Sequence, residues 1–146
     1  MSIGSDNLRP TVRPAVLLAE DDPDQSDMLR ETLEDEGYSV DTALTGDAAW
    51  RKLLDHNYDM VILDVRMPGR DGDSILKQYR QQPGKASVPV VLVSAFATET
   101  DLLRYRANGA SASFAKPFNV NELLKTLAAL WKKRGRSGRF APIPQA

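Results

Sequence analysis

Short apolar runs alternate along this chain with segments in which apolar residues recur every three or four positions. The runs at 16–19, 60–63 and 88–93 are continuous, which is typical of strands buried on both faces of a sheet. The run at 38–40 is shorter and more polar, as expected of an edge strand, and 112–115 forms a short fifth run. The pattern therefore predicts five strands.

A helix is predicted after each strand. The pair Asp22-Pro23 has the residue types preferred at an N-cap and at the first helical position, and Gly37 ends that helix. Amphipathic spacing predicts further helices around 48–54, 75–79, 98–107 and 120–131. Strand–helix units with crossovers of this length favour a parallel sheet covered by helices on both faces.

The predicted fold class is therefore α/β: a doubly wound (βα)5 flavodoxin-like three-layer sandwich with parallel strands in the order 2-1-3-4-5. In such a sheet, ligands bind at the carboxyl ends of the strands, where the strand order changes direction between the first and third strands. Along the chain we predict a flexible leader at 1–13, one domain at 14–133 and a flexible basic tail or linker at 134–146.

The composition is that of an ordinary globular domain, with 42% hydrophobic and 27% charged residues. The formal net charge of −1 gives no overall attraction to nucleic acid or to an anionic membrane. Cysteine is absent, which excludes disulfides and thiolate sites and fits a reducing cytoplasm. The sequence shows neither a membrane-spanning segment nor a signal peptide. We therefore expect a cytoplasmic protein that binds neither membrane nor, directly, nucleic acid.

Charged side chains follow the predicted strands at the edge where ligands bind. Glu20 and Asp21 follow the first strand, Asp64 the third, and Lys116 the fifth. Carboxylates held close together repel one another, and a bound Mg²⁺, which prefers oxygen ligands, removes that penalty. An aspartate in such a site can act as a nucleophile toward phosphorus, with Lys116 offsetting the added charge. Ser94 ends the fourth strand, so its hydroxyl can bond a phosphoryl oxygen.

Four stretches carry a resemblance to a known family. They are LLAEDDP at 17–23, VILDVRMPGRDG at 61–72, VVLVSA at 90–95 and GASASFAKPF at 109–118. In their order and spacing they resemble the response-regulator receiver domain of two-component signalling, over roughly residues 14–132.

The resemblance implies a role for each site residue. Asp64 is the phosphoacceptor, and Ser94 and Lys116 assist it. The implied Mg²⁺ ligands are Glu20, Asp21, Asp64 and the backbone carbonyl of Arg66. A cis peptide bond between Lys116 and Pro117 is also implied.

The implied partners are a histidine kinase or a histidine phosphotransfer protein, which supplies the phosphoryl group. The phosphorylated chain then signals to a downstream protein by binding it or by forming a homodimer, and it catalyses only its own phosphorylation and dephosphorylation. The sequence leaves open the kinase, the target and the oligomeric state. It also leaves open whether this is a stand-alone, chemotaxis-regulator-like protein or a piece of a longer chain.

One position departs from the family pattern. Most receivers carry an aromatic residue three positions before the lysine, whereas here Ser113 stands there and Phe114 follows it. Neighbouring residues of a strand point to opposite faces. We therefore expect either that Ser94 couples to the surface in another way, or that the face formed by the fourth helix and fifth strand changes little.

Arg66 and Phe96 lie two positions after Asp64 and Ser94, respectively. In the family these positions border the path of the water that hydrolyses the acyl phosphate. We expect both bulky side chains to hinder that water, so that Phe96→Ala loses its phosphoryl group faster than the wild type.

Two other functions compete with this hypothesis. A pseudo-receiver would keep the fold as a binding module without phosphorylation, and the departure at Ser113 favours it. A phosphatase of the haloacid-dehalogenase type also uses an aspartate and Mg²⁺, but it needs an acid two positions after the nucleophile, where Arg66 stands.

Among the other acidic residues, Asp22 is predicted to be a helix cap, and Asp71 and Asp73 are predicted to be loop or helix-start residues rather than metal ligands.

Overall fold

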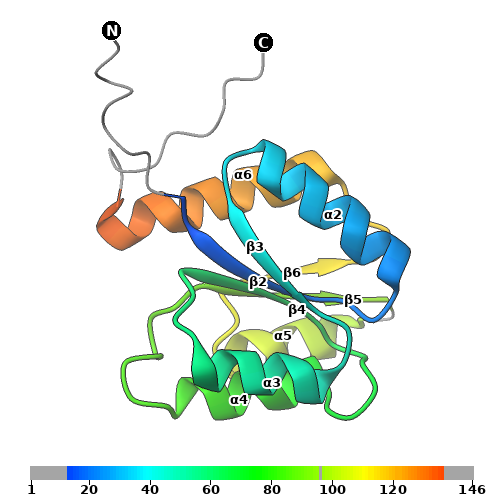
Figure 1. Cartoon of the computed structure of the whole chain (residues 1–146). Coiled ribbons are helices and arrows are strands. Elements are labelled where there is room, and N and C mark those ends of the chain that lie inside the picture. The colour runs from blue at the N-terminus through cyan, green and yellow to red at the C-terminus, as the bar shows by residue number, and fades with distance from the viewer. Residues whose placement is uncertain (1–12, 96, 137–146) are drawn as a thin grey trace, which may run out of the picture.

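The computed structural model describes residues 13–95 and 97–136. Its strands are β2 (Ala15–Ala19), β3 (Ser39–Ala43), β4 (Met60–Asp64), β5 (Val90–Ser94) and β6 (Ala112–Ala115). Its helices are α2 (Pro23–Asp35), α3 (Gly46–Asp55), α4 (Gly72–Arg80), α5 (Glu99–Ala107) and α6 (Val120–Trp131), followed by the π-helical turn η1 (Lys132–Arg136). The sheet is the middle of three layers, with α2 and α6 on one face and α3, α4 and α5 on the other (Figure 1).

All strand pairs in the sheet are parallel, and the spatial order is β3-β2-β4-β5-β6. Numbered along the chain this order is 2-1-3-4-5, so the predicted doubly wound fold is confirmed. The direction of the chain across the sheet changes between β2 and β4, where Ala19 pairs with Leu63. The residues that come next, Glu20 and Asp64, therefore reach the same edge of the sheet.

An apolar core lies on each face of the sheet, and β2 contributes to both. Val16 and Leu18 belong to the core shared with α2 and α6, whereas Leu17 and Ala19 belong to the core shared with α3 and α4. The alternation follows from the period of two in a strand. Because both faces are covered, the central strands need apolar residues at every position, which explains the continuous runs in the sequence.

Capping side chains define where the helices begin. The Asp22 carboxylate accepts hydrogen bonds from the backbone amides of Asp24 and Gln25, which confirms its predicted role as N-cap of α2. Thr98 caps α5 in a reciprocal pair with Asp101. These caps fix the first turns of the helices that follow β2 and β5, close to the ends of those strands.

The chain stays helical past Lys133, where the sequence predicts the domain to end. The turn η1 runs to Arg136, and the Arg134 guanidinium donates a hydrogen bond to the backbone carbonyl of Asp59 at 2.9 Å. This contact holds the helix end against the start of β4. The predicted domain boundary after Lys133 stays a prediction. The rest of the predicted tail (137–146) and most of the predicted leader (1–12) lie outside the described residues. Over the two ranges described, no helix has both the length and the apolarity to cross a bilayer.

Candidate functional site

The strands deliver the predicted functional side chains to one edge of the sheet. Each of the following lies at or just after the carboxyl end of a strand: Glu20 and Asp21 (β2), Asp64 (β4), Ser94 (β5) and Lys116 (β6). Parallel register keeps these ends level, with Ser94 paired to Ala115 immediately before the lysine. The strand order therefore brings these residues from distant parts of the sequence to one edge of the sheet.

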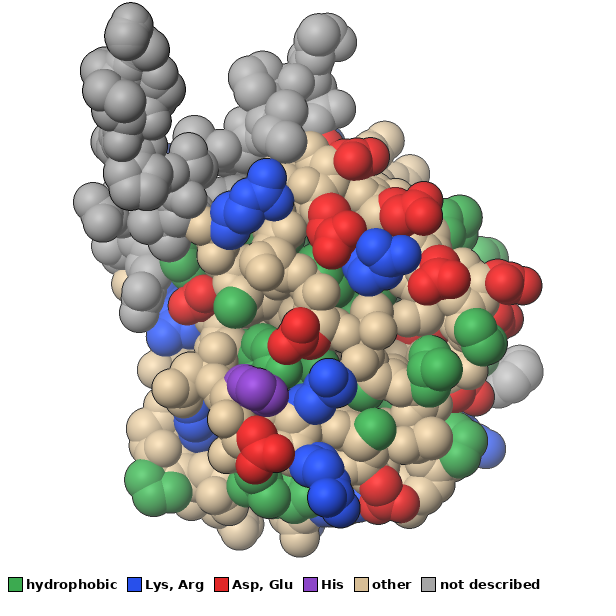
Figure 2. All heavy atoms as spheres, viewed as in Figure 1, with side chains coloured by type: hydrophobic (Ala, Val, Ile, Leu, Met, Phe, Trp, Pro, Cys, Tyr) green, Lys and Arg blue, Asp and Glu red, His purple; other side chains and the backbone are tan. Residues whose placement is uncertain are grey.

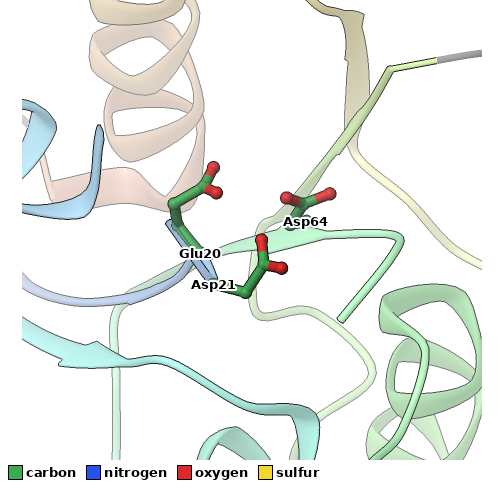
Figure 3. Close-up of side chains that lie close together, drawn as sticks. All are labelled: Glu20, Asp21 and Asp64. Carbon is green, nitrogen blue, oxygen red and sulfur yellow. The ribbon is translucent and has the colours of Figure 1, made fainter. Parts of the chain in front are cut away.

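The carboxylates of Glu20, Asp21 and Asp64 converge on one point. One oxygen from each lies within 4.8 Å of the others, and Figure 3 shows the three groups directed into the same region from the ends of two strands. Glu20 and Asp64 are only 7% and 6% exposed, whereas Asp21 is exposed. Carboxylate oxygens are the ligands that Mg²⁺ prefers, and the exposed side at Asp21 leaves room for the waters it retains. The donor set fits such an ion.

Lys116 bridges two of these carboxylates. Its Nζ donates hydrogen bonds to Glu20 Oε1 at 2.8 Å and to Asp64 Oδ2 at 2.9 Å. Its backbone amide donates to the carbonyl of Ser94 at 2.8 Å, which fixes the start of the side chain at the end of β5. The peptide bond between Lys116 and Pro117 is cis, as the family resemblance implies. Lys116 therefore supplies, from the protein's own side chains, positive charge that offsets the acidic cluster.

Burial and charge shift the pKa values of the bridged groups. Desolvation raises the pKa of Glu20 above its usual 4.5, although hydrogen bonds from Lys116 and from the Asp22 amide act in the opposite direction. Burial lowers the pKa of Lys116, but the hydrogen bonds and charges of Asp64 and Glu20 outweigh it and raise that pKa above 10.5. Lys116 therefore stays charged at neutral pH, and Glu20 releases its proton less readily than a solvated glutamate.

Backbone amides orient the two buried carboxylates. The amide of Arg66 donates to Asp64 Oδ1 at 3.2 Å, and the amide of Asp22 donates to Glu20 Oε2 at 3.1 Å. Together with Lys116, these two amides give each carboxylate oxygen of Glu20 and of Asp64 a hydrogen bond. The role of the Arg66 carbonyl as a metal ligand stays a prediction. So does the hindrance of hydrolysis by Arg66 and Phe96, because Phe96 lies outside the described residues.

Ser94 is buried beside a cavity that the sequence did not predict. The cavity has a volume of about 260 Å³ and is lined by Val65, Arg66, Asp71, Asp73, Ser94, Asp101, Arg104 and Tyr105. At its α5 end, Arg104 pairs with Asp101 at 2.9 Å and with Asp73 of α4 at 3.7 Å. Asp73 lies in the first turn of α4, as predicted. Its pairing across two helices has no local sequence signal, because the partners are 31 positions apart (104 − 73).

Ser113 and Phe114 face opposite sides of β6, as their positions in the sequence predict. Phe114 packs toward α6 and contacts Phe118, with ring centroids 6.0 Å apart. Ser113 lies on the side of α5, in a groove with Leu102, Leu103 and two charged residues, Glu99 and Arg106. The face next to α5 therefore presents a small hydroxyl where most receivers present an aromatic ring.

Comparisons with known proteins agree with this geometry. The family model of the response regulator receiver domain matches residues 16–128. The phosphate regulon transcriptional regulatory protein PhoB of Rhizobium meliloti is 34% identical over 120 residues, which are 82% of this chain and 53% of that protein. The transcriptional regulatory protein TcrA of Mycobacterium tuberculosis is 35% identical over 130 residues, 89% of this chain and 48% of that protein. The chain thus spans about half the length of these curated relatives.

Solved structures show the same similarity. The receiver domain of the Francisella response regulator 1452 superposes with a TM-score of 0.79 at 30% identity, covering 84% of this chain and 99% of that one. The chemotaxis response regulator CheY4 of Vibrio cholerae gives a TM-score of 0.76 at 32% identity, covering 82% and 99%. With a family match over most of the sequence and the acidic edge in place, this chain belongs to the response regulator receiver domain family.

Proposed function

We propose that this chain is a phosphorelay response regulator that accepts a phosphoryl group from a phosphohistidine donor onto Asp64, with Mg²⁺ as cofactor. The observation that carries the proposal is the contact between Lys116 and two of the three clustered carboxylates. A lysine held at 2.9 Å from Asp64 is already within reach of any group that becomes attached to this aspartate.

The residues that would hold the ion are Glu20, Asp21 and Asp64, together with the backbone carbonyl of Arg66. When bound, Mg²⁺ supplies positive charge that offsets the oxygens of a transferring phosphoryl group. The exposed Asp21 lies on the side of the cluster that is open to solvent. The buried Glu20 and Asp64 lie on its closed side, where charges interact more strongly than in water.

In the proposed step, a carboxylate oxygen of Asp64 attacks the phosphorus of the donor. The new O–P bond forms as the P–N bond of the phosphohistidine breaks, and the electron pair of that bond returns to the imidazole nitrogen. The product on this chain is an acyl phosphate, whose extra negative charge faces Lys116. The Ser94 hydroxyl, at the end of the neighbouring strand, is proposed to bond a phosphoryl oxygen. Catalysis here means positioning and charge compensation, and the chain acts on no other substrate.

The proposed output is phosphorylation-dependent binding to a partner protein or to a second copy of the chain. The curated relatives are transcriptional regulators that extend well beyond the matched segment, so the whole protein's target is a separate question. Acidic side chains gather over α2 on the face shown in Figure 2. This acidic surface of α2 would repel the phosphate backbone of a nucleic acid, so we do not propose that the described domain binds DNA through it.

The two competing functions fit the site less well. A pseudo-receiver does not need a lysine bonded to both Glu20 and Asp64. A haloacid-dehalogenase phosphatase needs an acid two positions after the nucleophile, where this chain has the exposed Arg66.

The test uses acetyl phosphate as a small donor and intact-protein mass as the measurement. We expect the wild type to gain one phosphoryl group in the presence of Mg²⁺, and to gain none with EDTA or in the Asp64→Ala variant. A folded wild type that gains no mass would favour the pseudo-receiver. Steady hydrolysis of a phosphomonoester such as p-nitrophenyl phosphate would favour the phosphatase.

A further inference from the structure

The loop that joins Asp64 to α4 lies directly against the first turn of α3. The amide of Gly46, the first residue of α3, donates to the carbonyl of Pro68 in this loop at 2.9 Å. A Cβ atom at Gly46 would lie 2.7 Å from both the carbonyl carbon and the nitrogen of Arg70, inside van der Waals contact with backbone. Gly46 does not have a positive φ, so close approach alone requires a glycine here.

The loop meets α3 and β4 at two further close contacts. Gly69 lies so near α3 that a Cβ there would be 2.5 Å from Asp47 Oδ2. At the other end of the loop, a Cβ on Gly72 would lie 3.0 Å from the carbonyl carbon of Asp64. The amide of Gly72 donates to the Val65 carbonyl at 2.7 Å, which closes the loop on itself. The backbone from Asp64 to α4 is thus confined at three points.

Side chains fasten the same loop to both neighbouring helices. The Arg70 guanidinium lies over the Trp50 ring of α3, 4.7 Å from its centroid, and donates a hydrogen bond to Gln78 of α4. Val65 and Met67 point the other way, into the core that α3 and α4 share. Arg70 therefore covers the loop from outside while two apolar side chains anchor it from inside.

This loop holds one oxygen of the Asp64 carboxylate, while Lys116 holds the other. Oδ1 of Asp64 accepts a hydrogen bond from the amide of Arg66, the second residue past it, at 3.2 Å. Any shift of the loop away from α3 moves that amide, and the carboxylate turns with it. Small displacements of a nucleophile or a metal ligand have large effects on rate and affinity.

We propose that Gly46 and the Trp50–Arg70 pair are positioning residues for the phosphoacceptor. They hold the loop against α3, and the loop in turn holds Asp64 through the Arg66 amide. The inference rests on the proposed function of Asp64. It adds that the start of α3 (46–50), which touches no reacting atom, sets the metal affinity and reactivity of the site.

Gly46→Ala is the sharpest test, because the loop contact and local helix preference predict opposite signs. Alanine near the start of a helix stabilises a protein when space is available, but here a methyl group must push the Arg70 backbone away. We expect Gly46→Ala to remain folded and to bind Mg²⁺ about tenfold more weakly by calorimetric titration, as for partners that orient metal ligands. We also expect faster amide hydrogen exchange at Arg66 and Gly72.

Gly84→Ala is the matched control. Gly84 has φ +77° and no atom within 4 Å of its Cβ position, so this variant strains the backbone far from the loop contact. It should lower stability while leaving Mg²⁺ affinity unchanged. If Gly84→Ala weakens Mg²⁺ binding as much as Gly46→Ala does, affinity merely follows global stability and the proposal is wrong. The proposal is also wrong if Gly46→Ala keeps the wild-type affinity for Mg²⁺ and the wild-type rates of amide hydrogen exchange at Arg66 and Gly72.

Trp50 offers a second route that does not depend on Gly46→Ala folding. Trp50→Ala removes the ring beneath Arg70 and should weaken Mg²⁺ binding and speed exchange at Gly72, whereas Trp50→Phe, which keeps a ring, should restore both. Equal behaviour of the two variants would contradict the proposal. If the wild type binds no Mg²⁺, the proposed function fails, while amide exchange at Gly72 still decides whether α3 holds the loop.

Discussion

Two regions on the same face of the sheet are held in very different ways. In the α3–loop region (Gly46–Asp55 and residues 65–71), the helix buries Gly46, Ala49 and Leu53. The second region is α5–β6 (Glu99–Ala107 and Ala112–Ala115). Within α5, which the structure describes in full, Tyr105 is the one buried residue. Leu103 of α5 is 70% exposed. Because apolar burial is the main stabilising contribution, α5 is the more weakly attached helix.

The strands repeat this difference. Every residue of β4 and of β5 is buried, whereas none of β6 is in the part of the sheet that the structure describes. Asp64 thus ends a fully buried strand, and Glu20 follows β2, which is buried from Val16 on. Lys116 reaches both carboxylates from the weakly packed edge. Weakly packed elements are the ones that rearrange at low free energy. The comparison teaches that the acidic site lies on the firmly packed half of the sheet and that the elements best able to rearrange lie on the other half, with Lys116 joining the two.

The largest expected effect comes from breaking that connection. Lys116→Met removes the cation that bridges Asp64 and Glu20. We expect the rate of phosphorylation by acetyl phosphate to fall about 10²–10³-fold, the usual consequence of losing one preorganised electrostatic partner. The rate is measured by intact mass against time. The exposed Lys125 provides the control, since Lys125→Met should react at the wild-type rate, and a wild-type rate in Lys116→Met would refute the role of the bridge.

The next effect concerns the two regions directly. Amides in α5 should exchange with solvent at least about tenfold faster than those in α3, because opening α5 exposes less apolar surface. Hydrogen exchange followed by NMR on the unphosphorylated protein measures both helices at once. Phosphorylation should change exchange in α5 and β6 more than in α3. Equal protection of the two helices would remove the basis for the comparison.

A third effect is the pH dependence of Mg²⁺ binding through Glu20. Because burial raises the folded-state pKa of Glu20 above 4.5, its contribution to stability is full below that value and is lost as the pH rises through the folded pKa. Without a metal ion, burial therefore disfavours the ionised form of Glu20, yet Mg²⁺ binds only that form. Affinity should fall by up to about tenfold per pH unit as the pH drops through the raised pKa.

Calorimetric titrations between pH 7 and about 4.5, near the ordinary glutamate pKa, measure this dependence. The Glu20→Gln variant should bind Mg²⁺ more weakly and lack this part of the pH dependence. A Mg²⁺ affinity that stays constant down to the ordinary glutamate pKa would show that Mg²⁺ binding does not depend on ionised Glu20.

The smallest effect comes from the two ion pairs of Arg104, one within α5 and one that joins α5 to α4. Arg104 is half exposed and pairs with Asp73 at 3.7 Å and Asp101 at 2.9 Å. Arg104→Gln should lower the free energy of unfolding by only about 0.2–1 kcal/mol, as for exposed pairs. Urea denaturation measures it, with the exposed Arg106→Gln as control. A much larger loss would mean that α5 is held by charge instead of by Tyr105, which changes the comparison.

The sequence was sufficient for the features that depend on repeated local patterns. Apolar runs identified the strands, Asp22 marked the start of α2, and the positions of Glu20, Asp64 and Lys116 after separate strands brought them to one edge. Parallel pairing then brings the carboxyl ends of these strands to one edge of the sheet, so the residues that follow them lie close together. The face of each residue in β6 was also predictable from the period of two.

What the sequence could not predict depends on contacts between segments that have no local signature. The closeness of Gly46 to Arg70 exists only after α3 and the loop have packed together, and a lone glycine near a helix start predicts no partner. The same holds for the Arg104–Asp73 pair and for Arg134, whose bond to Asp59 extends the helix past the predicted end. Such contacts depend on how distant segments pack in the folded protein, and the spacing of residues along the chain does not reveal that packing.

The central claim is that Asp64, among three neighbouring carboxylates, is the one that becomes phosphorylated. Borohydride reduces an aspartyl phosphate to homoserine, so reducing the acetyl phosphate-treated protein and sequencing its peptides by tandem mass spectrometry identifies the modified position. Conversion at residue 64 and at neither 20 nor 21 is the predicted result. Conversion at Glu20 or Asp21 with Asp64 unmodified, or no conversion in a folded protein that binds Mg²⁺, would contradict it.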